Sequence, residues 1–114
     1  MKIEGPGKRL SIFIGEADRW HGRSLADAIV LMLREEGLAG ATVLRGVEGF
    51  GANSRIHTAH VLRLSEDLPI VIEAVDREDR IRAVLPKLDE MVTEGLVCLS
   101  DVEVVAYRHS GEEA

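Results

Sequence analysis

The sequence predicts an α+β domain of the ferredoxin-like type, in which two helices cover one face of an antiparallel sheet. Three observations support this prediction. The predicted elements follow the order β-α-β-β-α-β, each predicted helix carries one apolar stripe, and 114 residues suffice for one domain but not for two. We therefore expect a single domain over residues 1–114, with frayed ends at 1–7 and 110–114 and an extra short strand near the C-terminus.

The first strand and the first helix are predicted by the spacing of their apolar residues. Apolar side chains fall at alternate positions in residues 8–15, as in a strand with one buried face. Ser24 suits a helix N-cap and Gly37 suits the position just after a helix. Between them, apolar residues recur at helical spacing, which predicts a helix over residues 25–36.

The middle of the chain contains two predicted strands separated by a long connection. Residues 41–47 are expected to form a strand, and a glycine-punctuated segment without periodicity then runs from 48 to about 60. Connections of this length are usually functional or disordered. Residues 61–64 are compatible with a continued strand, followed by a local break at 65–67. Residues 69–75 are nearly all apolar and predict a buried strand, with proline at its first position.

The second helix is predicted by apolar residues that recur at helical spacing after Asp76. Asp76 is expected to cap this helix, because Asp79 stands three residues after it, as Asp27 does after Ser24. Pro86 lies inside the pattern and predicts a kink in the turn before it. Gly95 is expected to end the helix.

Two short strands are expected at the end of the chain, over residues 96–99 and 102–107, with a turn at Ser100-Asp101. The predicted strands carry apolar residues on both faces, although the two helices can cover only one. An uncovered apolar face usually marks an interface, so we expect a homo-oligomer with inward-facing sheets, either a dimer or a ring. Glu73 is a charge in an otherwise apolar strand, and we expect it to pair with an arginine at a subunit contact.

Composition excludes several classes of function. Fourteen Lys and Arg against twenty Asp and Glu give a net charge of −6, which argues against nucleic-acid binding by bulk electrostatics. One cysteine, Cys98, permits no internal disulfide and no cysteine-based zinc site. No apolar run approaches the roughly 20 residues of a membrane span, and no signal peptide is recognisable. We expect a cytoplasmic protein without membrane insertion.

Several stretches of the sequence resemble the PII signalling proteins. Residues 40–51 (GATVLRGVEGFG) resemble the second PII strand and the start of the long T-loop that follows it. Residues 67–73 (DLPIVIE) resemble the PII strand that resumes after the T-loop. Residues 107–113 (YRHSGEE) resemble the PII C-terminal segment. Residues 8–108 resemble more closely a family of small uncharacterised PII-like domains of bacteria and archaea. The recurring phrases of that family stand here as RGVEGFG (45–51), RIHTA (55–59) and LSEDLP (64–69).

This resemblance implies a non-enzymatic signalling trimer. In PII proteins the sheets line the centre, the T-loops contact partner proteins, and adenine nucleotides bind between subunits. Relatives of the small family are often encoded beside channels of the fluoride-exporter type, which implies a membrane transport protein as partner. Two PII features are missing: the loop corresponding to 93–96 has no lysine, and the two tail arginines fall on Tyr107 and His109, with Arg108 between them. The effector therefore stays open among AMP, ADP, ATP, a smaller anion and no nucleotide.

The candidate ligand-binding residues combine guanidinium groups with a glycine-rich backbone. A guanidinium matches a phosphate or carboxylate bidentately, and glycines let the backbone approach a ligand. The alternative for each arginine is a solvated surface residue, and for the glycines a simple turn. The candidate residues are Arg45, Gly49, Phe50, Gly51, Arg55, His57 and Arg108.

Two other functional classes remain open. A small enzyme would use His57 or His60 as the acid–base group, with Arg55 holding an anionic substrate. A divalent-metal-binding trimer would use both histidines, but residues three apart in a strand point to opposite faces and no third ligand is evident. We therefore expect no metal site. Trp20 is expected to pack at a subunit edge beside the helix cap, although that helix end also suits an anion.

Overall fold

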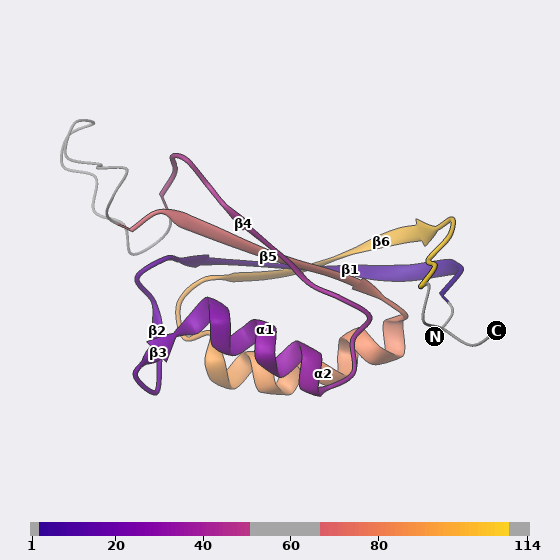
Figure 1. Cartoon of the computed structure of the whole chain (residues 1–114), viewed down its shortest axis with the longest axis horizontal. Coiled ribbons are helices and arrows are strands. Elements are labelled where there is room, and N and C mark those ends of the chain that lie inside the picture. Colours follow the sequence, from indigo (N-terminus) through magenta and orange to yellow (C-terminus); the bar gives the residue numbers. More distant parts are fainter. Residues whose placement is uncertain (1–2, 51–66, 110–114) are drawn as a thin grey trace.

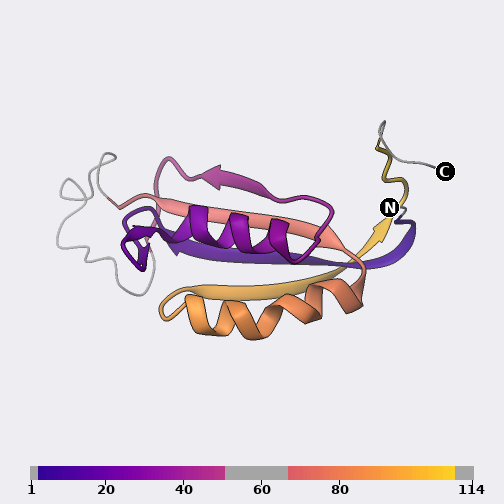
Figure 2. The ribbon, with the colours of Figure 1, turned by 60° about the horizontal axis from the view of Figure 1, so that its bottom comes forward.

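The structure, a computed structural model, describes residues 3–50 and 67–109 and confirms the ferredoxin-like fold. Its main sheet has four antiparallel strands in the order β4-β5-β1-β6, and two helices lie side by side against one face (Figures 1 and 2). The sheet consists of β1 (Gly5–Gly15), β4 (Thr42–Arg45), β5 (Pro69–Asp76) and β6 (Leu96–Val104). The helices are α1 (Leu25–Glu35) and α2 (Glu78–Met91), and a ribbon of β2 (Arg19–Trp20) and β3 (Arg23–Ser24) precedes α1.

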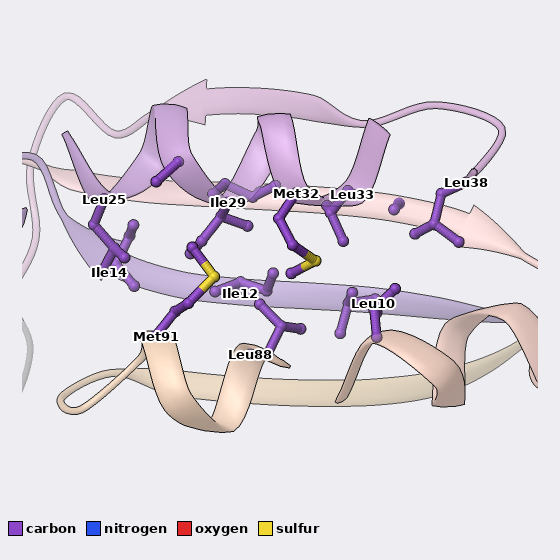
Figure 3. Packing of buried hydrophobic residues seen from close by; sticks show 14 of the residues in the cluster. Leu10, Ile12, Ile14, Leu25, Ile29, Met32, Leu33, Leu38, Leu88 and Met91 are labelled. Atoms are coloured by element: carbon purple, nitrogen blue, oxygen red, sulfur yellow. The ribbon is translucent and has the colours of Figure 1, made fainter. Parts of the chain in front are cut away.

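The hydrophobic core lies between the sheet and the two helices (Figure 3). The predicted alternation in β1 is confirmed, because Leu10, Ile12 and Ile14 all face the helices and are buried. Ser24 caps α1 as predicted, since its Oγ accepts a hydrogen bond from the Asp27 N–H at 3.2 Å. The helices contribute the predicted stripes: Leu25, Ala28, Ile29, Met32 and Leu33 from α1, and Ile81, Val84, Leu88 and Met91 from α2.

The predicted cap of the second helix is wrong. Arg77 is the N-cap residue of α2 and makes no side-chain cap hydrogen bond. Asp76 is the last residue of β5, where strand alternation places it on the buried face with Ile72 and Ala74. Its carboxylate is buried, and it accepts the N–H of Arg77, the N-cap residue itself, at 2.7 Å.

The predicted C-terminal end of this helix is also wrong. α2 continues through Pro86 but ends at Met91, four residues before Gly95. Gly95 instead lies in the turn that leads into β6, with a φ of 150°. A Cβ atom at this position would lie 2.6 Å from the carbonyl oxygen of Phe13, so the close approach of two backbones explains the glycine.

The expected turn at Ser100-Asp101 and the extra strand after it are not formed. β6 is one strand of 9 residues, and within the described part of the chain no further strand follows it. The physical reason is that β1 begins at Gly5 rather than near Lys8, so that it offers β6 a longer partner. Ser100 pairs with Arg9, and Asp101 pairs with Lys8.

The face of the sheet opposite the helices is uncovered within the described residues. On this face, residues that pair between neighbouring strands line up in rows across β4, β5, β1 and β6. One row is apolar and consists of Leu44, Val71, Phe13 and Leu96, of which Phe13 is 41% and Leu96 54% exposed. The next row is mainly polar and consists of Thr42, Glu73, Ser11 and Cys98. The expectation of strands that are apolar on both faces is therefore confirmed.

Candidate functional site

The base of the 48–60 loop lies at the end of the sheet where β1 ends. The Gly46 N–H donates to the Pro69 carbonyl oxygen at 2.7 Å, which joins the end of β4 to the start of β5. Arg45, the last residue of β4, binds both carboxylate oxygens of Glu16: its Nη2 lies 3.0 Å from Oε1 and its Nε 3.0 Å from Oε2. This bidentate pair holds the guanidinium at the loop base, where a competing anion can reach it because the side chain is exposed.

Glycine and aromatic residues follow Arg45 at this end. A Cβ at Gly49 would lie 3.1 Å from Pro69 Cγ, so the backbone passes close to the proline ring. Phe50 is 70% exposed and Val47 81% exposed. The predicted candidates Gly51, Arg55 and His57, together with His60, lie outside the described residues.

Arg108 lies at the other end of the sheet from the loop base within one copy of the chain. Val104, the last residue of β6, pairs with Gly5 at the start of β1, whereas Gly15 at the end of β1 pairs with Pro69. The segment that contains Arg108 therefore follows β6 at the end opposite to the loop base (Figure 1). The structure brings Arg45, Gly49 and Phe50 together but leaves Arg108 apart from them.

A cavity of about 350 Å³ lies at the same end as Arg108. Its lining is mostly small or apolar, and the exposed Arg34 supplies a charged group there. The Tyr107 hydroxyl donates to the Ala39 carbonyl oxygen at 3.4 Å, so the tail that carries Arg108 contacts a lining residue. The cavity is lined by Val30, Leu33, Arg34, Leu38, Ala39, Gly40 and Ala41.

Two charged residues hold the connection between α1 and β4 that lines this cavity. The fully buried Asp76 accepts the Ala39 N–H through Oδ2 at 2.9 Å. Arg80 donates from Nη1 to the Gly37 carbonyl oxygen at 2.9 Å, and its Nε lies 3.9 Å from the Asp76 carboxylate. Sequence reasoning missed the cavity and Arg80, and it predicted Asp76 only as a helix cap. The run of small residues 39–41 was the one available signal, since it leaves the backbone accessible.

The β2–β3 ribbon places an aromatic pair beside the start of α1. The rings of Trp20 and His21 are stacked, with centroids 4.1 Å apart and planes 16° from parallel. His21 has a φ of 51°, which is uncommon for a residue other than glycine, and Gly22 follows with 81°. Trp20 packs against the core at the start of α1.

The groups with resolved pKa shifts lie on the surface and not in the cavity. A hydrogen bond from Lys8 lowers the pKa of the Asp101 carboxyl, and one from Arg77 lowers the pKa of Asp79. No cluster of three or more His, Cys, Asp or Glu suited to a metal ion occurs in the described parts of the chain. Across the same residues, no helix is both long and apolar enough to cross a membrane.

Comparison with solved structures places this fold among PII-like proteins. A candidate PII-like signalling protein (TTHA0516) of Thermus thermophilus matches with a TM-score of 0.61 at 17% identity, over 89% of this chain and 91% of that chain. CPII of Thiomonas intermedia, in a structure bound to ADP, AMP and acetate, matches with a TM-score of 0.56 at 20% identity, over 88% and 89% of the two chains.

Comparison of sequences establishes the family. The UPF0166 protein MJ1524 of Methanocaldococcus jannaschii is 39% identical over 98 residues, which cover 85% of this chain and 90% of that protein. A UPF0166 protein of Aquifex aeolicus is 34% identical over 98 residues, which cover 86% of this chain and 92% of that protein. The model of the DUF190 family, described as Uncharacterized ACR, COG1993, matches residues 7–104. With a PII-like fold and this match over most of its length, the chain belongs to the DUF190 family.

Proposed function

We propose that this chain is a non-enzymatic, cytoplasmic regulator of the PII type that works as a homotrimer. An adenine nucleotide binds at each subunit boundary and changes the conformation of the 48–60 loop. The loop then acts on a partner protein, and a membrane transporter or channel is the partner that the family resemblance implies. The PII-like fold of the chain and the ADP and AMP in the CPII structure support this reading.

The separation of the candidate residues is the observation that carries the proposal. Arg45, Gly49 and Phe50 stand at one end of the sheet, while Arg108 and the cavity stand at the other. A single copy therefore offers two half-sites. Two copies arranged with the loop base of one beside the tail of the next assemble a complete site, and a ring repeats that contact at every boundary.

Together the two half-sites offer the two kinds of chemistry that a nucleotide requires. The cavity is mostly apolar, and the backbone of Gly40 and Ala41 offers polar groups to a base. Arg45 and Arg108 supply guanidinium groups for phosphate. The lysine-free turn at 93–96 offers fewer cations than the PII loop, so we propose AMP or ADP rather than ATP as the effector.

The Arg45–Glu16 pair suggests how binding alters the loop. A phosphate that takes the place of the Glu16 carboxylate pulls Arg45 away from the end of β1. Gly46, the next residue, is bonded to Pro69 where the loop leaves the sheet, so the change is transmitted directly to the loop base. The proposed switch is driven by differential contacts in the two states.

Calorimetric titration with AMP, ADP and ATP, together with thermal unfolding, tests the proposal. A nucleotide at about 100 times its Kd stabilises the folded state by ~2.7 kcal/mol, which raises the Tm measurably. We expect AMP or ADP to bind, and Arg45→Ala and Arg108→Ala each to weaken binding. Arg82→Ala is the matched control, because Arg82 pairs with Glu78 on the exposed surface of α2. No binding by any nucleotide to the assembled protein contradicts the proposal.

A further inference from the structure

The uncovered face of the sheet carries one positive and one negative side chain. Strand alternation assigns to this face the residues that do not point at the helices. Among these residues of the four strands, only Arg9 in β1 and Glu73 in β5 are charged. Glu73 lies in the row next to the apolar row of Leu44, Val71, Phe13 and Leu96, and Arg9 lies one row further, opposite Val75.

The two charges do not pair within one copy. Glu73 stands opposite Ser11, and Arg9 stands opposite Val75, so the charged residues occupy diagonal positions on adjacent strands. Arg9 turns toward β6, where its Nε donates to Ser100 Oγ at 3.2 Å. Glu73 turns to Ser11, whose hydroxyl donates to its Oε2 at 3.4 Å. Neither Arg9 nor Glu73 has an ion pair among the described residues.

Any partner that covers this face must place an opposite charge near each of the two charged side chains. A partner that covers the exposed apolar residues of this face, from Phe13 and Leu96 to Val75 opposite Arg9, takes both charges out of water as well. An uncompensated buried charge is strongly destabilising. A neutral apolar partner cannot compensate them. A second copy of the same face presents an apolar row together with one anion and one cation at the same spacing, so it complements the first.

We propose that Arg9 of one copy forms an ion pair with Glu73 of the next where the uncovered faces of neighbouring copies meet. The proposal rests on the homotrimer proposed above and specifies the contact that fixes its register. The apolar row supplies most of the buried area, whereas the charge pair determines which relative position of two sheets is allowed. In a trimer the pair occurs three times, once at each boundary.

Charge reversal with rescue tests this contact in the full chain. Arg9→Glu places two carboxylates at each contact and Glu73→Arg places two guanidinium groups there, whereas the double variant restores opposite charges. Sedimentation velocity over a range of concentrations gives the dissociation constant of each assembly. We expect each single reversal to raise it about tenfold or more, equivalent to ~1.4 kcal/mol, and the double variant to return it close to that of the original chain.

Two matched controls separate folding from pairing. Arg19→Glu makes the same change at an exposed residue of the β2–β3 ribbon, and we expect it to leave assembly unchanged. If a reversed variant does not fold, as judged by circular dichroism, the neutral pair Arg9→Gln and Glu73→Gln replaces it. In that double-mutant cycle the two single variants weaken assembly, and the double variant weakens it by less than their sum.

The outcomes distinguish this contact from the proposed function. Single reversals that leave the dissociation constant unchanged overturn the Arg9–Glu73 pair but leave the trimer standing. A double variant that folds but is not rescued also overturns the pair. An unaltered chain that sediments as a monomer at every concentration overturns both the pair and the trimer. A trimer that has the pair but binds no nucleotide contradicts the effector alone.

Discussion

Replacement of Asp76 by alanine is expected to destabilise the protein strongly. The side chain is fully buried, and its carboxylate accepts the Ala39 N–H at 2.9 Å and the Arg77 N–H at 2.7 Å. Hydrogen bonds to a charged group contribute about 1.5–3 kcal/mol each, so the loss of both lowers the free energy of unfolding by about 3–5 kcal/mol. That is a large part of the 5–15 kcal/mol that is usual for a domain, and it lowers the Tm by roughly 12 °C or more.

Urea unfolding followed by tryptophan fluorescence measures this loss, because Trp20 is the single tryptophan of the chain. All variants are compared at one protein concentration, since assembly makes stability depend on concentration. Asp76→Asn keeps one acceptor oxygen, and we expect it to fall between Asp76→Ala and the original protein. Asp101→Ala is the control, because Asp101 is 86% exposed in its ion pair with Lys8 and its loss should leave the midpoint almost unchanged. An Asp76→Ala midpoint equal to that of Asp101→Ala would refute the reasoning.

Two further predictions concern a tight turn and acid stability. Gly95→Ala should lower the free energy of unfolding by about 1–3 kcal/mol in the same urea assay, because the new Cβ meets the Phe13 carbonyl oxygen. Gly40→Ala is the control and should leave the free energy of unfolding unchanged, because a Cβ at Gly40 would have no atom within 4 Å. The hydrogen bond from Lys8 lowers the pKa of Asp101 in the folded state below its ordinary 3.8. The contribution of this pair to stability is therefore fully present above pH 3.8, and it is lost as the pH falls through the lowered pKa. Because the pair is exposed and contributes little to stability, NMR titration of the Asp101 carboxyl is the direct check: its midpoint should lie below 3.8 and Lys8→Ala should move it up, whereas an unshifted midpoint would count against the pair.

The parts of the fold that follow from local periodicity were predictable. The apolar stripes of both helices and the alternation of β1 appear in the structure at the predicted positions, because burial imposes the period of each element on the sequence. The wrong predictions concern residues whose conformation is determined by tertiary contacts. Asp76 has the chemistry of a helix cap, but the sheet turns it into the core. Ser100-Asp101 has the composition of a turn, but pairing with β1 keeps it extended.

The candidate site was predictable only in part for the same reason. Guanidinium chemistry, the glycine pattern and the resemblance to PII proteins together predicted Arg45, Gly49 and Phe50 as candidates, and these residues lie at one end of the sheet. The cavity beside Ala39 depends on how the connection after α1 packs against that helix, which periodicity does not specify. The position of Arg108 depends on the register of β6 along β1, and sequence spacing does not encode that register either.

The placement of two half-sites at opposite ends of one sheet has a genetic consequence. In the proposed trimer each complete site takes its loop base from one subunit and its tail from the next. A chain defective at Arg45 and a chain defective at Arg108 can therefore complement one another in mixed assemblies. Every trimer that contains both kinds of chain has one boundary at which the intact loop base of one meets the intact tail of the other. Two alleles that are each inactive alone should then restore nucleotide binding when they are expressed together.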